Sequence, residues 1–280
     1  MTPRLMGIVN ANPDSFSDPR ARALDELVAD ALAQVEAGAD VIDVGGESGV
    51  THVAPVTAEE ERKRILPLVE RLVAEGITVS VDTWKAEVAE PVLAAGATLI
   101  NDVSGLRDPA VADACARHDA GLVVMHTRAE PKVKAFPAYD DVVADVRALL
   151  AERTALAVSL GVAAEKIVVD PGPDFTKTPA ETVEVLRAIE RIAALGRPLL
   201  LAVSRKYFVG AITGRPPAAR LAGTLAAVGW AADAGAAIVR VHDVAETVDF
   251  LRLRRVLAGE EDVPDFDDGD ETLKWIRARG

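Results

Sequence analysis

Eight apolar, β-branched runs recur along the chain, and polar or charged side chains lie at or just beyond the end of each run. Strands that are buried on both faces of a sheet have continuous Val, Ile and Leu runs of this kind. Helical stretches separate most of the runs, and this alternation predicts parallel strands joined by crossovers. The predicted strands cover residues 5–9, 41–44, 78–81, 98–100, 122–125, 166–169, 199–203 and 238–241.

The segments between these runs place apolar residues three and four positions apart, which is the helical period. Thr57 and Glu60 form a predicted capping box at the start of the second helix. Eight strand and helix units in 280 residues match a closed (β/α)8 TIM barrel. We therefore predict an α/β fold, with a single TIM barrel over residues 1–258 and a short acidic C-terminal extension over residues 259–280. The predicted helices cover residues 23–37, 57–75, 85–95, 109–118, 142–160, 180–194, 218–234 and 244–257.

Composition supports one large domain, because half of the 280 residues are hydrophobic. The sequence has neither an apolar window of 18 residues nor an N-terminal signal pattern, which predicts a soluble, cytoplasmic protein that does not bind membranes. The net charge of −13 argues against a nucleic-acid partner, since phosphate binding needs a basic surface. Cys115 is the single cysteine, and we expect it to be a buried structural thiol.

The C-terminal extension carries much of the negative charge, between Glu260 and Glu271. Like charges at this density favour a solvated linker. Leu273, Trp275 and Ile276 follow this segment. A short docked helix and a loosely held tail are the alternatives for these residues.

Polar side chains at the strand ends are the candidate chemistry, because the active site of a TIM barrel lies at the carboxyl ends of its strands. Asp82, Asn101 and Asp170 end three separate strands. A carboxylate accepts two parallel hydrogen bonds, and an amide completes donor and acceptor pairing around a flat heterocycle. The three residues together predict a site for a planar, nitrogen-rich ligand. The alternative for each residue alone is a bond to the backbone or to a neighbouring cation.

Cations end the last two predicted strands, where barrels often bind phosphate. Arg205 and Lys206 follow the seventh strand, and Arg240 and His242 share one face of the eighth. This arrangement predicts a phosphate or pyrophosphate clamp. A hard cation such as Mg²⁺, held by Asn10 and by substrate phosphate oxygens, fits the available ligands better than zinc does.

Eight motifs in collinear order resemble the dihydropteroate synthases of the pterin-binding barrel family, over about residues 4–257. The order makes the resemblance specific to that family. For His126, a structural role is at least as consistent with the sequence as a catalytic one. The motifs are Met6–Asp18 (MGIVNANPDSFSD), Val41–Ser48 (VIDVGGES), Val79–Thr83 (VSVDT), Ile100–Gly105 (INDVSG), Val124–His126 (VMH), Asp170–Gly172 (DPG), Ser204–Lys206 (SRK) and Val239–Asp243 (VRVHD).

The resemblance implies a transferase of folate biosynthesis that acts as a homodimer. Such an enzyme joins 6-hydroxymethyl-7,8-dihydropterin pyrophosphate to p-aminobenzoate and releases pyrophosphate. Ionisation of the carbon–oxygen bond gives a pterin cation, which the arylamine attacks, so the protein supplies no nucleophile. The implied pterin site contains Asp82, Asn101, Asp170 and Lys206, with Met125 packed on the ring. Phe175 would lie beside the aminobenzoate, Arg240 and His242 would bind pyrophosphate, and Asn10 would bind Mg²⁺; the expected catalytic residues are Lys206, Arg240 and His242.

The chain departs from the family pattern in its loops. The second loop lacks the expected arginine after Ser48, and the candidates to replace that cation are His52 and Arg128. The first loop is shorter than usual and has Asn12 in place of a threonine. Asp174 stands where the family has a glycine, and Tyr207 stands where a serine is common.

These departures leave two main interpretations. The first is a dihydropteroate synthase. The second is a paralogue that binds pterin pyrophosphate but uses p-aminobenzoate weakly or not at all, as an enzyme for another amine or as a binding protein. A methyltransferase domain of the same superfamily is disfavoured, because methyl transfer does not need the anion clamp. A barrel for sugar phosphates is disfavoured by Asp82, Asn101 and Asp170 together.

Overall fold

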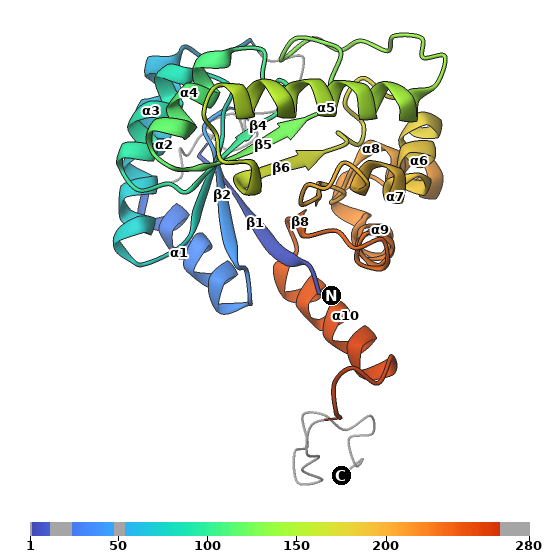
Figure 1. Ribbon diagram of the computed structural model, residues 1–280. Helices are drawn as coiled ribbons and strands as arrows, with labels where there is room; N and C mark the ends of the chain where they lie inside the picture. Colours follow the sequence, from blue (N-terminus) through green and yellow to red (C-terminus); the bar gives the residue numbers. More distant parts are fainter. Residues whose placement is uncertain (1, 12–23, 48–53, 264–280) are drawn as a thin grey trace, which may run out of the picture.

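The computed structural model describes residues 2–11, 24–47 and 54–263. In this part of the chain eight parallel strands form one sheet in the order β6-β5-β4-β3-β2-β1-β8-β7 (Figure 1). A bridge between Val169 and Leu199 brings the two edges of the sheet together. The predicted (β/α)8 barrel is thus confirmed. The strands are β1 (Arg4–Asn10), β2 (Val41–Gly45), β3 (Val79–Asp82), β4 (Leu99–Asp102), β5 (Gly121–Met125), β6 (Ile167–Asp170), β7 (Leu200–Leu201) and β8 (Ile238–Val241).

Helices surround the sheet on its outer face (Figure 1). The predicted segment 180–194 forms two helices that meet at Ala188, and the segment 218–234 begins with a short 3-10 turn. The helices are α1 (Leu24–Glu36), α2 (Ala58–Ala74), α3 (Ala86–Ala94), α4 (Pro109–Arg117), α5 (Val142–Ser159), α6 (Pro179–Arg187), α7 (Ile189–Ala193), α8 (Tyr207–Thr213), α9 (Leu221–Asp233) and α10 (Val244–Leu257), with 3-10 turns at Ala164–Lys166 and Pro217–Ala219.

Two local predictions need correction. The side chain of Thr57 accepts a hydrogen bond from the backbone of Glu60, but the Glu60 carboxylate pairs with Arg64, so only half of the expected capping box forms at α2. The complete capping box lies at the start of α6, between Thr178 and Glu181. Helix α8 was not predicted, because its seven residues are too few to show a helical period.

The barrel interior is layered, because alternate residues of a strand face the same side. The lower layer is apolar and includes Val41 of β2, Val168 of β6 and Ile238 of β8. Two residues further along each strand, the same face carries Asp43, Asp170 and Arg240. The sequence therefore forms an apolar layer inside the barrel and places a polar layer next to it, at the carboxyl ends of the strands.

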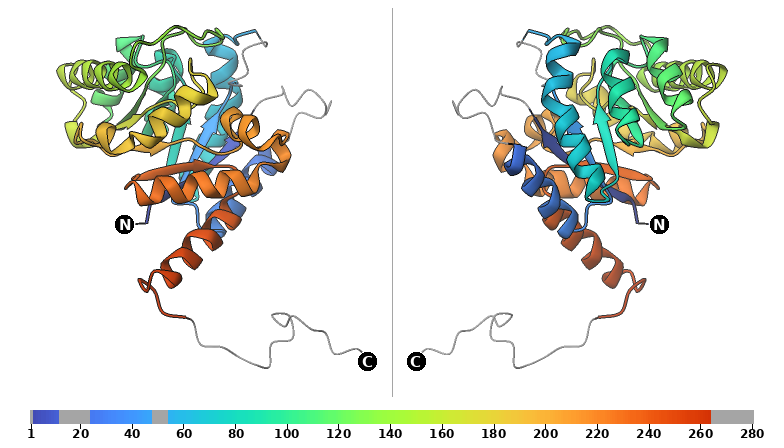
Figure 2. Two further views of the ribbon diagram at one scale, coloured as in Figure 1. Left: turned by 90° about the vertical axis from the view of Figure 1, so that its right-hand side faces the viewer. Right: turned by 90° about the vertical axis from the view of Figure 1, so that its left-hand side faces the viewer.

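The outer layer of the barrel forms the main hydrophobic core between strands and helices. Cys115 lies in this layer on α4, where burial raises the pKa of its thiol to about 12, as expected for a structural thiol. The last described helix, α10, projects from the end of the barrel at which the N-terminus lies (Figure 2). Among the described helices none is long and apolar enough to cross a membrane. The residues around Trp275, for which a short docked helix and a loosely held tail are the alternatives, lie outside the described residues.

Candidate functional site

Asp43 of β2 is the centre of the polar layer. Its buried carboxylate accepts hydrogen bonds from Ser80 Oγ at 2.6 Å, from Asn101 Nδ2 at 3.0 Å and from Arg240 Nε at 2.6 Å. The contact with Ser80 follows from the register, which pairs these two residues across β2 and β3. Asp43 is one of the polar residues at the predicted strand ends, but no role in the site was predicted for it. Its position two residues after the inward-facing Val41 is the signal that marks it.

Arg240 of β8 bridges two carboxylates. Its Nη2 atom lies 3.2 Å from Asp82 Oδ2, while Nε binds Asp43. Burial raises the pKa of Asp82 to about 7, although the Arg240 guanidinium opposes the rise. Asp82 belongs to the predicted ring-binding site and Arg240 to the predicted anion clamp. The structure therefore brings these two predicted sites into direct contact.

Asp170 and Lys206 lie on the opposite wall of the barrel mouth. The Asp170 carboxylate is buried, which raises its pKa, and it accepts the backbone N–H of Gly172 at 2.7 Å. Burial lowers the pKa of Lys206, whose Nζ atom lies 4.4 Å from the centre of the Phe175 ring. Met125 is buried in register with Asp170. These predicted site residues thus share one part of the barrel mouth.

The remaining members of the predicted clamp are already engaged. Arg205 forms an ion pair with Asp243, so its charge is balanced within the protein. His242 Nδ1 lies 2.9 Å from Ser204 Oγ, and burial together with the Arg240 and Arg205 guanidinium groups lowers the pKa of His242 to about 4. His242 is therefore neutral at pH 7. It offers a ring nitrogen for a hydrogen bond to an anion, while Arg240 supplies the positive charge.

Lys177 and His126 hold the loop that follows β6. Lys177 is fully buried, and its Nζ atom donates to Gly172 O and Phe175 O at 3.0 Å each and contacts His126 Nδ1 at 2.7 Å. Burial lowers the pKa of Lys177 to about 7 and that of His126 to about 3. A neutral His126 accepts at Nδ1 and turns its Nε2–H toward Asp145, 3.4 Å away. The structure favours the structural interpretation of this histidine.

Arg128 does not take the place of the missing loop arginine. Its guanidinium makes a two-pronged ion pair with Asp145, at 2.7 Å from both Nε and Nη2. That pair anchors the loop after β5 to α5. The other candidate, His52, lies outside the described residues, as does Asn12.

A buried ionic cluster fastens the two ends of the second loop. Lys85 Nζ lies 2.5 Å from both Glu47 Oε2 and Glu61 Oε2, and it also donates to Val56 O at 2.9 Å. Lys132, from the loop after β5, approaches Glu47 Oε1 at 3.4 Å. The second loop, which departs from the family pattern, is therefore held at both ends, at Glu47 and Val56, by the Lys85 ammonium group.

Asn10, the predicted Mg²⁺ ligand, is the last residue of β1. Its side-chain oxygen lies over Gly45, where a Cβ atom would approach it to 3.3 Å. The described residues contain no group of three His, Cys, Asp or Glu side chains that could hold a metal ion. An amide oxygen fits one position of an ion that takes its other ligands from phosphate and water.

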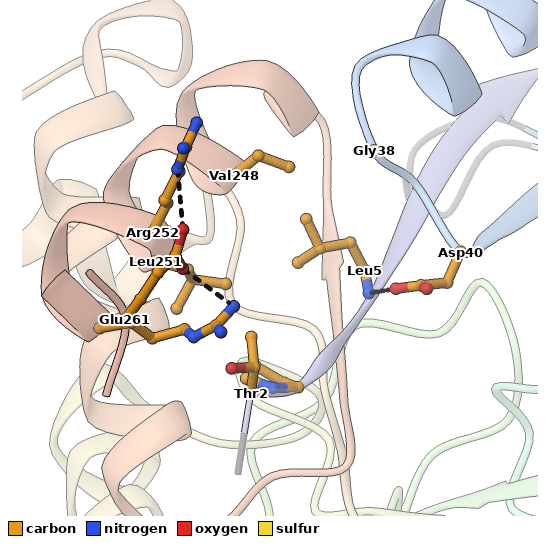
Figure 3. Close-up of a pocket in the computed structure, with 10 residues that line it drawn as sticks. Thr2, Leu5, Gly38, Asp40, Val248, Leu251, Arg252 and Glu261 are labelled. Carbon is orange, nitrogen blue, oxygen red and sulfur yellow. Dashed lines mark hydrogen bonds and ion pairs between the residues drawn. The ribbon is translucent and has the colours of Figure 1, made fainter. Parts of the chain in front are cut away.

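A cavity of about 250 Å³ lies at the other end of the barrel (Figure 3). Leu5, Val248 and Leu251 contribute apolar lining, and Arg252 and Glu261 form an ion pair beside them. This cavity lies at the amino ends of the strands. The polar layer lies at the carboxyl ends, where barrel chemistry takes place.

The comparisons with known proteins cover most of the barrel. A family model described as "Pterin binding enzyme" matches residues 6–242. A dihydropteroate synthase of Bacillus subtilis (strain 168) is 41% identical over 243 residues, which are 86% of this chain and 83% of that protein. A Xanthomonas albilineans dihydropteroate synthase structure with 4-aminobenzoic acid has a TM-score of 0.86 and 43% identity, covering 94% of each chain. Another structure of that enzyme, in complex with 7,8-dihydropteroate, has a TM-score of 0.83 and 43% identity, covering 94% of this chain and 95% of that one.

Proposed function

The chain belongs to the family of pterin-binding enzymes, and from this premise we propose that it catalyses the dihydropteroate synthase reaction. The substrates are 6-hydroxymethyl-7,8-dihydropterin pyrophosphate and p-aminobenzoate, and the products are dihydropteroate and pyrophosphate. The observation that carries the proposal is the composition of the polar layer. It combines hydrogen-bond acceptors for a nitrogen-rich ring, Asp82 and Asp170, with the cations Lys206 and Arg240.

Asp82, Asn101, Asp170 and Lys206 bind the pterin in this proposal. The two carboxylates accept its N–H groups, because the buried site offers them little water to bind instead. Asn101 donates one Nδ2–H to Asp43, which leaves its carbonyl oxygen for an N–H of the ring and its second N–H for a ring acceptor. Met125 packs on the ring.

Arg240, His242 and Lys206 act on the leaving group. The carbon–oxygen bond breaks with its electron pair passing to pyrophosphate, and positive charge near that oxygen stabilises the developing anion. The arylamine nitrogen then forms the new bond to carbon and loses a proton. Phe175 lies beside the incoming arylamine, over the Lys206 ammonium.

Asn10 is the proposed protein ligand of Mg²⁺, with pyrophosphate oxygens and water completing the coordination. The ion, when bound, would neutralise part of the charge on pyrophosphate. The fit of an amide oxygen at the end of β1 supports this assignment.

A cytoplasmic homodimer is the proposed form of the protein. Tyr207 and Ile212 of α8 and Trp230 of α9 have 60%, 66% and 50% of their surfaces exposed. Large apolar side chains that gather on neighbouring helices often mark an interface. Light scattering after size-exclusion chromatography tests the dimer, because a monomer mass at micromolar concentration contradicts it.

The paralogue remains the second candidate, because the second loop lacks the expected arginine and the described Arg128 is engaged elsewhere. One experiment separates the two functions. The purified protein is incubated with pterin pyrophosphate, Mg²⁺ and p-aminobenzoate, and dihydropteroate and pyrophosphate are both measured. Equal amounts of the two products support the synthase. Pterin binding without dihydropteroate contradicts it and supports the paralogue.

A further inference from the structure

The loop between β6 and α6 has an unusual backbone. Gly172, Asp174 and Thr176 have φ angles of 64°, 64° and 53°. Positive φ suits glycine but is unfavourable for other residues, and for a β-branched residue such as Thr176 it is rare. Such a conformation persists where the surrounding contacts determine it. The loop that carries Phe175 is therefore held by specific bonds.

Hydrogen bonds to neighbouring groups hold two of the positive-φ residues, Thr176 and Gly172. Thr176 accepts from Arg128 N at 3.1 Å and from the Tyr139 hydroxyl at 3.0 Å, and Lys177 binds the carbonyl oxygens of Gly172 and Phe175. The contacts of Thr176 join the loop to the segment after β5, and those of Lys177 lie within the loop. Asp174, the third positive-φ residue, instead contacts α6 and α8.

Asp174 joins the loop to two helices. Its backbone N–H donates to Thr182 Oγ1 of α6 at 3.1 Å, and the same hydroxyl lies 3.4 Å from Asp174 Oδ1. Both carboxylate oxygens accept the backbone N–H of Phe208, at 3.2 Å each. Helices α6 and α8 lie side by side on one flank of the barrel (Figure 1).

The bond to Phe208 fills a need of α8. The first N–H groups of a helix have no partner within the helix, and Lys206, the residue before α8, provides no side-chain cap. The Asp174 carboxylate supplies that partner from another loop. The bond between Asp174 and the Phe208 N–H therefore fixes two neighbours. Lys206 lies two residues before Phe208, and Phe175 directly follows Asp174.

We propose that Asp174 is a positioning residue, whose carboxylate clamps the loop after β6 to the start of α8 and so sets Phe175 against Lys206. The inference rests on the proposed function, in which these two residues contact p-aminobenzoate and pterin. Asp170 is held separately, through Gly172 and Lys177. Asp82 and Asn101 are likewise held by Arg240 and Asp43, so three of the four proposed pterin-binding residues do not depend on Asp174, and the clamp acts mainly on the aminobenzoate side of the site.

Three variants test the clamp. Asp174→Gly removes the carboxylate at a φ that glycine adopts easily, and Asp174→Asn keeps an oxygen acceptor and tolerates the same backbone. Asp119→Gly is the matched control, because Asp119 also has a positive φ, of 52°, but its exposed side chain pairs with Lys166 at the amino end of the barrel.

The first measurement is hydrogen exchange at the Phe208 amide, which needs no enzymatic activity. Asp174→Gly should speed exchange about tenfold, because the amide loses its acceptor. Asp174→Asn should stay within about threefold of the parent protein, and Asp119→Gly should match it. Unchanged exchange in Asp174→Gly, or equal acceleration in the Asn variant, overturns the clamp.

The second measurement is steady-state kinetics beside calorimetric binding of pterin pyrophosphate. We expect Asp174→Gly to raise KM for p-aminobenzoate about tenfold, with pterin affinity changed less than about threefold and KM restored by Asn. An unchanged KM, or equal losses for both substrates, overturns the positioning role. If the parent protein makes no dihydropteroate, the proposed function fails, and exchange at Phe208 still decides whether the clamp exists.

Discussion

Replacing Lys177 by methionine should change how the stability of the protein depends on pH. Lys177 is buried beneath the loop that carries Phe175, with three acceptors around its Nζ atom. An ammonium group has three N–H donors, one for each acceptor. Burial nevertheless lowers the pKa of this lysine from its ordinary 10.5 to about 7. The folded protein therefore releases a proton that the unfolded chain keeps until about pH 10.5.

The magnitude follows from this difference in proton binding. Between pH 7 and 10.5 the unfolded chain binds more protons at this site, so the free energy of unfolding rises with pH. A pKa lowered from 10.5 to about 7 corresponds to about 5 kcal/mol over the whole interval, at about 1.4 kcal/mol for each pH unit. Between pH 7 and pH 9 the gain is about 2 kcal/mol. Methionine has no proton to release and lacks this gain.

Urea unfolding at pH 6, 7, 8 and 9 measures the effect. The parent protein should gain about 2 kcal/mol relative to Lys177→Met between pH 7 and 9, whatever the variant loses at every pH by leaving three acceptors unpaired. Lys63→Met is the control, because the one ion pair of Lys63 among the described residues is the exposed pair with Glu59 on α2. Parallel stability profiles for the parent protein and Lys177→Met would refute the reasoning.

Three further predictions concern the polar layer. Asp170→Ala should weaken pterin binding about a hundredfold in calorimetry, because it removes a charged acceptor, and unchanged affinity contradicts the assignment. Arg240→Ala should lower the affinity for pterin pyrophosphate at least about tenfold more than the affinity for free pterin, and equal losses contradict the predicted anion clamp of Arg240 and His242. Pterin affinity should rise about tenfold from pH 6 to pH 8 as Asp82, with its pKa of about 7, becomes ionised, and Asp82→Asn should flatten this profile; a rise that persists in the Asn variant assigns the titration to another group.

The sequence was sufficient to predict the barrel, because each strand is a short apolar run with polar residues at or just beyond its end, and helical segments separate most of the runs. The run at Ile238–Val241 matches β8 residue for residue, and the inward face of that strand places Arg240 at the mouth. Of the predicted strand 199–203, Leu200 and Leu201 pair with β8, and Leu199 forms the bridge to β6. The chain then turns toward Arg205, which has a positive φ of 55°.

The partners of the polar side chains were not predictable in the same way. Whether Arg240 faces Asp43, Asp82 or an open mouth depends on the register of strands that lie far apart in the sequence. The same holds for Asp243, whose carboxylate takes up the charge of Arg205. A pattern within one strand specifies which face a residue occupies, and only the closed barrel specifies its neighbour.

The bridge from Arg240 to Asp82 also bears on how the proposed substrate binds. A buried ion pair is costly to break when one partner is left without a counter-charge. Free pterin would occupy Asp82 and leave Arg240 with only part of its charge balanced, whereas free pyrophosphate would draw Arg240 away and leave Asp82 unpaired. Pterin pyrophosphate supplies N–H donors to Asp82 and an anion to Arg240 together. The same ion pair thus favours the intact substrate over either of its halves, in a site whose floor is otherwise apolar.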